Sequence, residues 1–328
     1  MLPAEIERLA ARHVPGRGKL DIHPLRIGLV NETYRVLRDG GVYALRVAAG
    51  NPAALGLDRA WEARVLESAV LAGLAPALAY CDPRRGILVA HWVDGRPWSP
   101  AEVRQPSSIS RMAALIHAIH ALPMPAPPRL MSPLQWIDRY SAACKVADGG
   151  SGSAAATGGA AAAASAALRG AAGQRLAELA ALPGVDPVVC HSDLHTLNLI
   201  DTGRSLVLLD WEYAHAADPL WDLASWSANN DLAEEAGAVL LASYFGRAPT
   251  GDESRRLGLL IWLYDYICLL WSGYYLSLGL SLRRDARPDV AAHAQAAGHT
   301  QAAGDTEAGA ISARAELLAA RLRLPEFE

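Results

Sequence analysis

The stretch His191-Ser-Asp-Leu-His-Thr-Leu-Asn198 places a carboxylate, Asp193, five residues before an amide. An acidic pair, Asp210 and Glu212, ends an apolar run, and Asp210 lies 12 residues after that amide. In phosphoryl transfer one carboxylate orients the proton of the attacking hydroxyl, while an amide oxygen and a second carboxylate bind the Mg2+ that bridges the nucleotide phosphates. These residue types at this spacing therefore indicate phosphoryl transfer.

Two other interpretations of the segment explain less of it. His191, Asp193 and His195 would suit a simple turn between two buried strands, but a turn does not need the string Asp218-Pro-Leu-Trp-Asp-Leu-Ala that follows. A zinc site on His191 and His195 is disfavoured because they flank a polar loop, and no nearby Cys or His completes a tetrahedral set. The phosphotransferase interpretation is preferred.

The same residues resemble the catalytic loop and metal-binding turn of the kinase-like small-molecule phosphotransferases, the aminoglycoside phosphotransferase and choline kinase superfamily. The family pattern is H-x-D-x-x-x-x-N followed by a strand that ends in D-x-E, and the resemblance covers about residues 20–283. It implies Asp193 as the catalytic base and Asn198, Asp210 and Glu212 as Mg2+ ligands. It also implies an α+β, protein-kinase-like fold, with a small mixed lobe around an antiparallel sheet and a larger, mostly helical lobe.

A nucleotide-binding loop is expected upstream of this motif. Gly28-Leu-Val-Asn31-Glu-Thr33-Tyr34 is similar to the family's G-x-x-N-x-x-Y/F loop, in which backbone N–H groups, with Asn31 or Thr33, would reach the phosphates. Without the downstream motif, the segment favours an ordinary hairpin turn over a phosphate-binding loop.

The phosphates also need a cation that an acid on the following helix holds in place. Lysine is nearly absent, and neither Lys19 nor Lys145 lies on the expected strand Tyr43-Ala-Leu-Arg46-Val. Arg46 is therefore assigned this role, and Glu62, 16 residues later, is its expected partner. A guanidinium would contact two phosphates through its planar fork. The alternative is a solvated strand arginine and a surface acid.

The connection between the lobes would hold the adenine. The segment Ile87-Leu-Val-Ala-His91-Trp-Val93-Asp-Gly95 resembles the family hinge, and backbone groups near His91 to Val93 would bond the base. The sequence does not distinguish ATP from GTP as the phosphoryl donor.

Aromatic side chains are concentrated beyond the metal-binding turn, where the acceptor would bind. Aromatic faces bind quaternary ammonium or thiazolium groups with roughly 0.5–2 kcal/mol per contact, and a carboxylate such as Asp218 would add charge. The alternative is core packing, which is usual for aromatic residues at helical spacing. The assigned acceptor residues are Trp211, Tyr213, Asp218, Trp262, Tyr266, Trp271 and Tyr274.

The expected activity is ATP- and Mg2+-dependent phosphorylation of a small, cationic alcohol such as choline or ethanolamine. Thiamine is the second candidate, an aminoglycoside or sugar the third, and a catalytically weak nucleotide-binding regulatory module is the rival from another class. A protein kinase is disfavoured because the chain lacks D-F-G and A-P-E signatures.

The amino-acid composition indicates which binding partners and which cellular location to expect. The 328 residues carry 30 basic and 34 acidic side chains, a formal charge of −4 that gives no argument for nucleic acid or an anionic membrane. Four scattered cysteines and the lack of a long uncharged apolar stretch favour a cytoplasmic protein without membrane insertion. The oligomeric state stays open.

The elements that must position these residues follow from hydrophobic periodicity. We expect a nucleotide-binding lobe over 1–94, a catalytic lobe over 95–284 with a low-complexity insertion at 148–173, and an Ala-rich, partly helical tail over 285–328. Strands are predicted at 25–36, 41–47, 77–81 and 87–93, and helices at 3–13, 58–73, 107–122, 231–247, 252–283 and 307–323.

Overall fold

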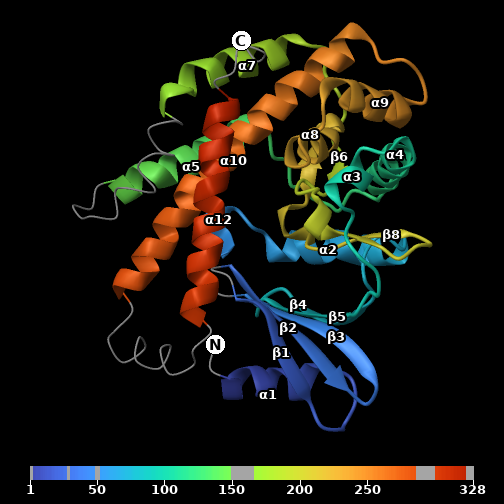
Figure 1. Ribbon diagram of the computed structural model, residues 1–328, viewed down its shortest axis with the longest axis vertical. Coiled ribbons are helices and arrows are strands. Elements are labelled where there is room, and N and C mark those ends of the chain that lie inside the picture. The colour runs from blue at the N-terminus through green and yellow to red at the C-terminus, as the bar shows by residue number, and fades with distance from the viewer. Residues whose placement is uncertain (1–2, 28–29, 49–51, 149–165, 286–299, 323–328) are drawn as a thin grey trace. The chain divides into compact units, whose positions relative to one another are not determined.

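The computed structural model describes residues 3–27, 30–48, 52–148, 166–285 and 300–322 (Figure 1). The chain forms two compact units, one made of Met1–Leu130 with Val185–Ser254 and the other of Met131–Gly184 with Arg255–Glu328. The sheet and the predicted catalytic segment both belong to the first unit. The expected α+β class, with an N-terminal antiparallel sheet and a helical C-terminal part, is confirmed. The predicted lobe boundaries divide the chain by expected role and stay a prediction.

The first unit begins with a helix and a five-stranded antiparallel sheet of order β1-β2-β3-β5-β4. In β2 and β3 every second side chain is buried, as expected for strands with one face on a core. The β2–β3 turn has positive φ at Asp39 (51°) and Gly40 (79°), which suits a two-residue hairpin turn. The elements are α1 (Pro3–His13), β1 (Asp21–Ile27), β2 (Asn31–Arg38), β3 (Gly41–Ala48), β4 (Leu78–Asp82) and β5 (Ile87–His91).

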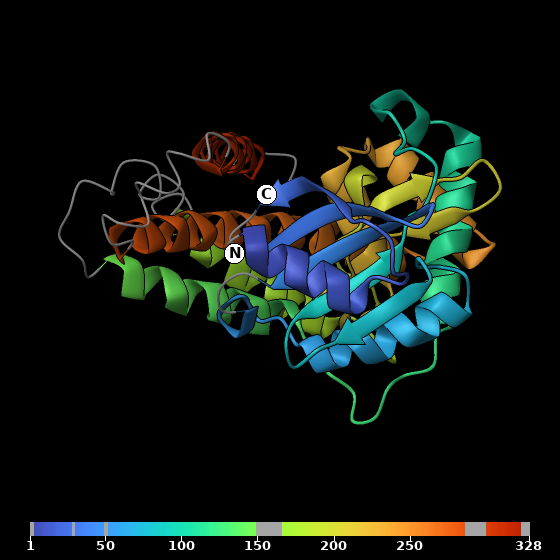
Figure 2. The same ribbon diagram turned by 90° about the horizontal axis from the view of Figure 1, so that it is seen from below.

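Helix α1 covers one face of this sheet (Figure 2). Ile6, Ala10 and Val14 recur every four residues, so they share one side of the helix, and they form one buried cluster with strand side chains such as Val36 and Leu45. The predicted helix over 3–13 is confirmed.

The apolar run over 25–36 is divided between two strands, since β1 ends at Ile27 and β2 begins at Asn31. The first hairpin turn was expected at residues 28–34, but Asn31 to Tyr34 belong to β2, so that the expected turn extended too far along the chain.

Helix α2 (Arg59–Leu71) follows a 3-10 turn, η1 (Pro52–Leu55), and begins at a strong cap. The Asp58 carboxylate accepts the N–H groups of Ala60 and Trp61, both at 3.0 Å, which satisfies donors that the first helical turn leaves free. Trp61 and Glu62 are buried, so the helix carries its acidic side chain inward. The predicted helix over 58–73 is confirmed.

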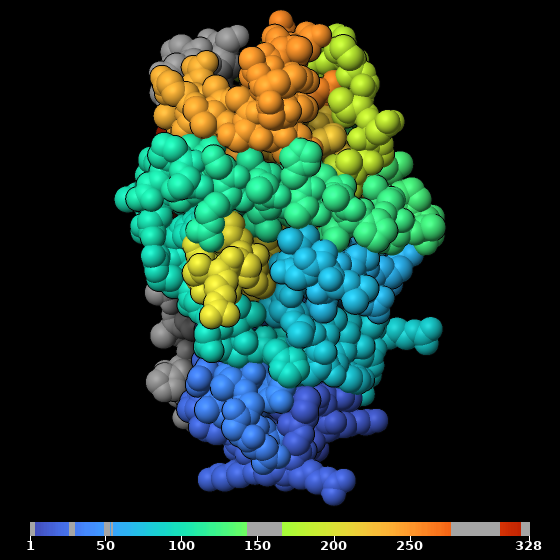
Figure 3. Space-filling model, turned by 90° about the vertical axis from the view of Figure 1, so that its right-hand side faces the viewer, coloured from blue at the N-terminus to red at the C-terminus, as the bar shows by residue number. Residues whose placement is uncertain are grey.

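The remainder of the first unit surrounds the predicted catalytic segment. Strand β6 pairs with β9, and β7 pairs with β8. Figure 3 shows the β7–β8 hairpin in yellow between α2 in light blue and α3–α4 in teal. The elements are α3 (Pro100–Val103), α4 (Pro106–His120), β6 (Val188–Cys190), η2 (Thr196–Asn198), β7 (Leu199–Asp201), β8 (Leu206–Leu208), η3 (Trp211–Tyr213), β9 (His215–Ala217), α8 (Leu220–Asn229) and α9 (Glu234–Phe245).

Helices α4 and α9 confirm the predictions at 107–122 and 231–247, but α8 was not predicted. Leu220 to Ala228 are all buried, and a helix buried on every side lacks the polar face that gives a 3.6-residue periodicity.

The second unit is helical in its described residues. It contains α5 (Pro133–Asp148), α7 (Arg169–Ala181), most of α10 (Gly251–Asp285) and α12 (Thr300–Arg321). Within it Arg255 pairs with Glu178 at 2.8 Å, and Arg321 pairs with Asp265. The segment Gly251–Leu276 is the one described helix long and apolar enough to cross a membrane, but 72% of its apolar window is buried, as in a core helix.

Candidate active site

The backbone of the predicted catalytic loop is supported by a buried carboxylate on α8, to which it donates two N–H groups. Asp222 is 0% exposed, and its two oxygens accept the N–H groups of His191 (3.0 Å) and Ser192 (2.7 Å). Burial alone would raise the pKa of Asp222, but the hydrogen bond from His120 and the loop N–H groups keep it below its usual value. Ser192 has a φ of 71°, a conformation that L residues adopt only under constraint. The charged hydrogen bonds supply that constraint.

His191 joins the loop to Leu209, the residue between β8 and the predicted metal-binding turn. Its Nε2 lies 2.9 Å from the carbonyl oxygen of Leu209, and its Nδ1 accepts the N–H of Asp193 at 3.3 Å. Burial lowers the pKa of His191, so the ring is neutral, with Nε2 as the donor. Because backbone groups occupy both ring nitrogens, the ring is built into the loop rather than directed toward a zinc ion.

Asp193 and Asn198 lie side by side. The amide nitrogen of Asn198 donates to the carbonyl oxygen of Asp193 at 3.0 Å and to its carboxylate at 3.1 Å. Those two bonds leave Oδ1 of Asn198 as the amide atom suited to bind a cation. The Asp193 side chain is 31% exposed, with His195 Nε2 3.5 Å away, so a hydroxyl from solvent can approach it.

Arg46 joins the sheet to the predicted metal-binding turn, which contains Asp210 and Glu212. It pairs with Glu62 on α2, donates to Asp210 at 2.9 Å and lies 4.0 Å from Glu212. Burial would lower the pKa of Arg46, but the three carboxylates raise it, so the guanidinium stays charged. Asp210 itself has a φ of 60°, which turns its side chain at the start of η3.

Arg59 is a central member of this cluster that the sequence reasoning missed. One of its nitrogens lies 2.9 Å from Glu62 and 2.9 Å from Glu212, and the other donates to Asn31 Oδ1 at 2.7 Å. Asn31 in turn donates to Glu212 at 2.6 Å. The usable signal was the three-residue spacing between Arg59 and Glu62, which puts both on one helix face.

The donor set of this cluster fits Mg2+. Three carboxylates (Glu62, Asp210, Glu212) face two guanidiniums, which leaves a formal charge of −1. Burial, and then the Asp210 charge, raise the pKa of Glu212, as expected where negative charge is incompletely balanced. Mg2+ prefers oxygen ligands of the kinds that Asp210, Glu212 and the Asn198 amide present.

The other predicted nucleotide residues lie along the sheet. Thr33 is paired with Arg46 across β2 and β3. His91 ends β5, and its N–H donates to the Ala77 carbonyl at 2.8 Å. Val93 follows in the connection and is half-buried. Gly28 lies outside the described residues. Contact of these groups with a nucleotide stays a prediction.

The predicted acceptor residues of the first unit support the loops around them. Trp211 is 1% exposed, packs on His191 and donates its indole N–H to the Leu208 carbonyl at 3.2 Å. The Asp218 carboxylate accepts the Leu220 N–H at 2.9 Å at the start of α8. Tyr213 is half-buried.

In the second unit the four predicted acceptor residues divide by burial. Trp262 (2% exposed) and Tyr266 are core residues that stack on each other with ring centroids 5.5 Å apart. Trp271 and Tyr274 are half-buried. Only the second pair presents appreciable side-chain surface, and its role toward the acceptor stays a prediction.

The first unit thus combines a carboxylate beside an amide, a turn with two further carboxylates, and a buried arginine–glutamate pair next to a five-stranded sheet. This combination is that of a kinase-like phosphotransferase. Residues 21–258 match the model of the phosphotransferase enzyme family, and the chain belongs to that family. It is a small-molecule kinase that phosphorylates a hydroxyl group.

The similar solved structures include choline and ethanolamine kinases as well as macrolide and spectinomycin phosphotransferases. A choline/ethanolamine kinase family protein from Mesorhizobium loti is 25% identical with a TM-score of 0.65, over 100% of this chain and 97% of that one. Choline kinase LicA from Streptococcus pneumoniae is 20% identical with a TM-score of 0.65, over 97% and 98%. Protein LicA of Haemophilus influenzae is 38% identical over 55 residues, which span 17% of this chain and only 21% of that protein.

Proposed function

We propose that this protein is an ATP- and Mg2+-dependent kinase of a small, cationic alcohol, with choline or ethanolamine as the acceptor and the cytoplasm as its location. The observation that carries the proposal is the hydrogen bond from the Asn198 amide to the Asp193 carboxylate, at 3.1 Å. The same unit contains the ion pair between Asp210 and Arg46. A LicA structure in complex with AMP supports an adenine nucleotide as the phosphoryl donor.

The chemistry follows from the charges in the site. The Asp193 carboxylate would accept a hydrogen bond from the acceptor hydroxyl and take its proton as the new O–P bond forms and the bond to ADP breaks. The transfer is direct and in line, without a phosphoenzyme. Arg46 would donate its planar fork to the phosphates. Bound Mg2+, held by Asp210, Asn198 and Glu212, would neutralise the phosphate charge.

The acceptor class rests on two supports. Over its whole length the chain is similar to a choline/ethanolamine kinase family protein at 25% identity. Trp271 and Tyr274 present partly exposed aromatic surface on α10, and such surface attracts a quaternary ammonium. Thiamine, whose thiazolium is also a flat cation, is the alternative on the same surface.

A phosphorylation screen tests the proposal. Purified protein with ATP and Mg2+ is offered choline, ethanolamine, thiamine, aminoglycosides and sugars, and ADP release is measured with and without each. Choline or ethanolamine should give the highest kcat/KM, and Asp193→Asn should lower kcat by orders of magnitude while nucleotide binding persists. Preference for an aminoglycoside or sugar would overturn the acceptor class. Nucleotide binding without turnover on any acceptor would indicate a regulatory module instead.

A further inference from the structure

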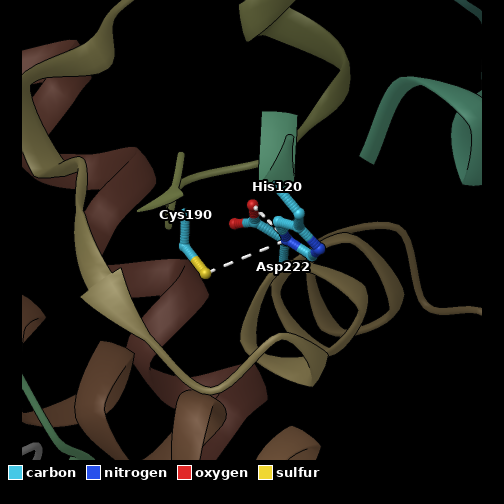
Figure 4. Close-up of side chains that lie close together, drawn as sticks. All are labelled: His120, Cys190 and Asp222. Carbon is cyan, nitrogen blue, oxygen red and sulfur yellow. Dashed lines mark hydrogen bonds and ion pairs between the residues drawn. The ribbon is translucent and has the colours of Figure 1, made fainter. Parts of the chain in front are cut away.

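Three buried side chains meet behind the catalytic loop: His120 from the end of α4, Cys190 from β6 and Asp222 from α8 (Figure 4). The Nε2 atom of His120 lies 3.3 Å from Asp222 Oδ2 and 3.9 Å from Cys190 Sγ. None of the steps described above uses His120.

The contacts favour a hydrogen-bonded relay over a metal site. Both Asp222 oxygens already accept loop N–H groups, and the Cys190 thiol lies 3.6 Å from the Asp218 carbonyl, to which it donates. Burial raises the pKa of the Cys190 thiol well above its usual value. A metal ion would need the thiolate, which this environment disfavours.

Tyr244 on α9 fixes the orientation of the histidine ring. Its hydroxyl lies 2.8 Å from His120 Nδ1. Burial raises the pKa of Tyr244 to about 12, so the phenol keeps its proton and can donate to Nδ1. With Nδ1 accepting, a neutral His120 carries its proton on Nε2, which faces Asp222.

A neighbouring histidine provides an internal comparison. His117 Nε2 lies 2.8 Å from the Tyr244 carbonyl, and its ring stacks on the Tyr244 ring with centroids 4.6 Å apart. His117 thus joins the same two helices, α4 and α9, but none of its described contacts is with Asp222.

We propose that His120 is a positioning residue for phosphoryl transfer. Oriented by Tyr244, it donates to Asp222, and Asp222 holds the backbone of His191 and Ser192, which sets the place of Asp193. Ser192 needs these hydrogen bonds because its left-handed backbone, with a φ of 71°, is strained for an L residue. The proposal rests on this loop being the catalytic loop.

Substitutions that keep or remove one donor test the idea. In His120→Gln the side-chain nitrogen can occupy the place of Nε2, so kcat should stay within about threefold of wild type, whereas His120→Asn is too short to reach Asp222. His120→Asn should lower kcat about 10–100-fold with little change in the KM for ATP, because a misplaced base costs rate rather than nucleotide affinity. The kcat of Tyr244→Phe should lie between those of His120→Gln and His120→Asn. His117→Gln, the matched control, should leave kcat unchanged whatever happens to the melting temperature.

A readout independent of activity separates this proposal from the proposed function. Hydrogen exchange of the peptide that contains His191 and Ser192 should speed up in His120→Asn and not in His120→Gln or His117→Gln. Wild-type exchange and kcat in His120→Asn would overturn the proposal, as would equal losses of kcat and stability in the Gln and Asn variants. Stoichiometric bound metal whose removal by a chelator loosens this peptide would establish a metal site instead.

Discussion

Replacing Arg46 with Met should destabilise the protein less than its contacts suggest, because Arg59 remains beside the same carboxylates. In this variant Glu62 would still be paired with Arg59, which lies 2.9 Å from it. Asp210 is partly exposed, so water can solvate its carboxylate. The expected loss is therefore that of hydrogen bonds to charged groups, about 1.5–3 kcal/mol. Arg59→Met should cost a similar amount, because Glu212 keeps Asn31 at 2.6 Å.

The double variant should lose more than the sum of the two single variants. It leaves Glu62 and Glu212 buried without a cation, and each buried carboxylate that loses its partner in this way costs about 3–5 kcal/mol. The coupling energy should thus be about 3 kcal/mol, at the upper end for residues in contact. Mg2+ should also stabilise the double variant more than the wild type, because it would bind a more negative cluster only in the folded state.

Denaturant unfolding of the four proteins, with and without Mg2+, measures these quantities. Arg64→Met is the control, because Arg64 lies on the same helix and donates to the Ala126 carbonyl at 2.7 Å rather than to the cluster. Its effect should add to that of Arg46→Met. Additivity of Arg46→Met and Arg59→Met within about 0.5 kcal/mol would show that the two arginines do not share their carboxylates.

Three further expectations concern the metal, the aromatic residues and pH. Asp210→Asn and Asn198→Ala should each raise the Mg2+ concentration needed for half-maximal activity, Asp210 more so because its ligand carries charge; activity that survives excess chelator would contradict this. Trp262→Ala should lose about 3–5 kcal/mol of stability, whereas Trp271→Ala should raise the acceptor KM roughly 5–30-fold with little change in stability; similar melting temperatures for the two variants would refute that division. Burial lowers the pKa of His215 to about 4, so its contribution to stability is complete above its unfolded pKa of about 6.5 and is lost as the pH falls toward 4. His215→Asn should therefore flatten the fall in unfolding free energy between those pH values, and an unchanged slope would contradict the assignment.

The motif residues could be predicted from the sequence because phosphoryl transfer requires particular atoms at particular spacings. Asp193, Asn198 and Asp210 belong to one short stretch, and the structure brings the first two into contact. The pairing of Arg46 with Glu62 followed from the scarcity of lysine and from the position of the next helix. Their roles toward nucleotide and metal stay predictions.

The residues that support the motif could not be predicted from the sequence in the same way, since their roles depend on contacts between distant segments. Arg59 matters through Glu212, 153 residues later, and His120 through Asp222 on a helix that periodicity did not reveal. Burial likewise separates Trp262 from Trp271, although both are tryptophans of one helix. Side-chain type could not supply that distinction.

The use of arginine at position 46 has a consequence for chemical proteomics. Nucleotide probes that acylate the phosphate-binding lysine of kinases need a neutral amine, and a guanidinium with this raised pKa offers none. The chain has only two lysines, and Lys19 is exposed beyond the N-terminal helix rather than on β3. If Arg46 binds the phosphates as proposed, a survey that counts kinases by lysine labelling would miss this enzyme, however abundant and active it is.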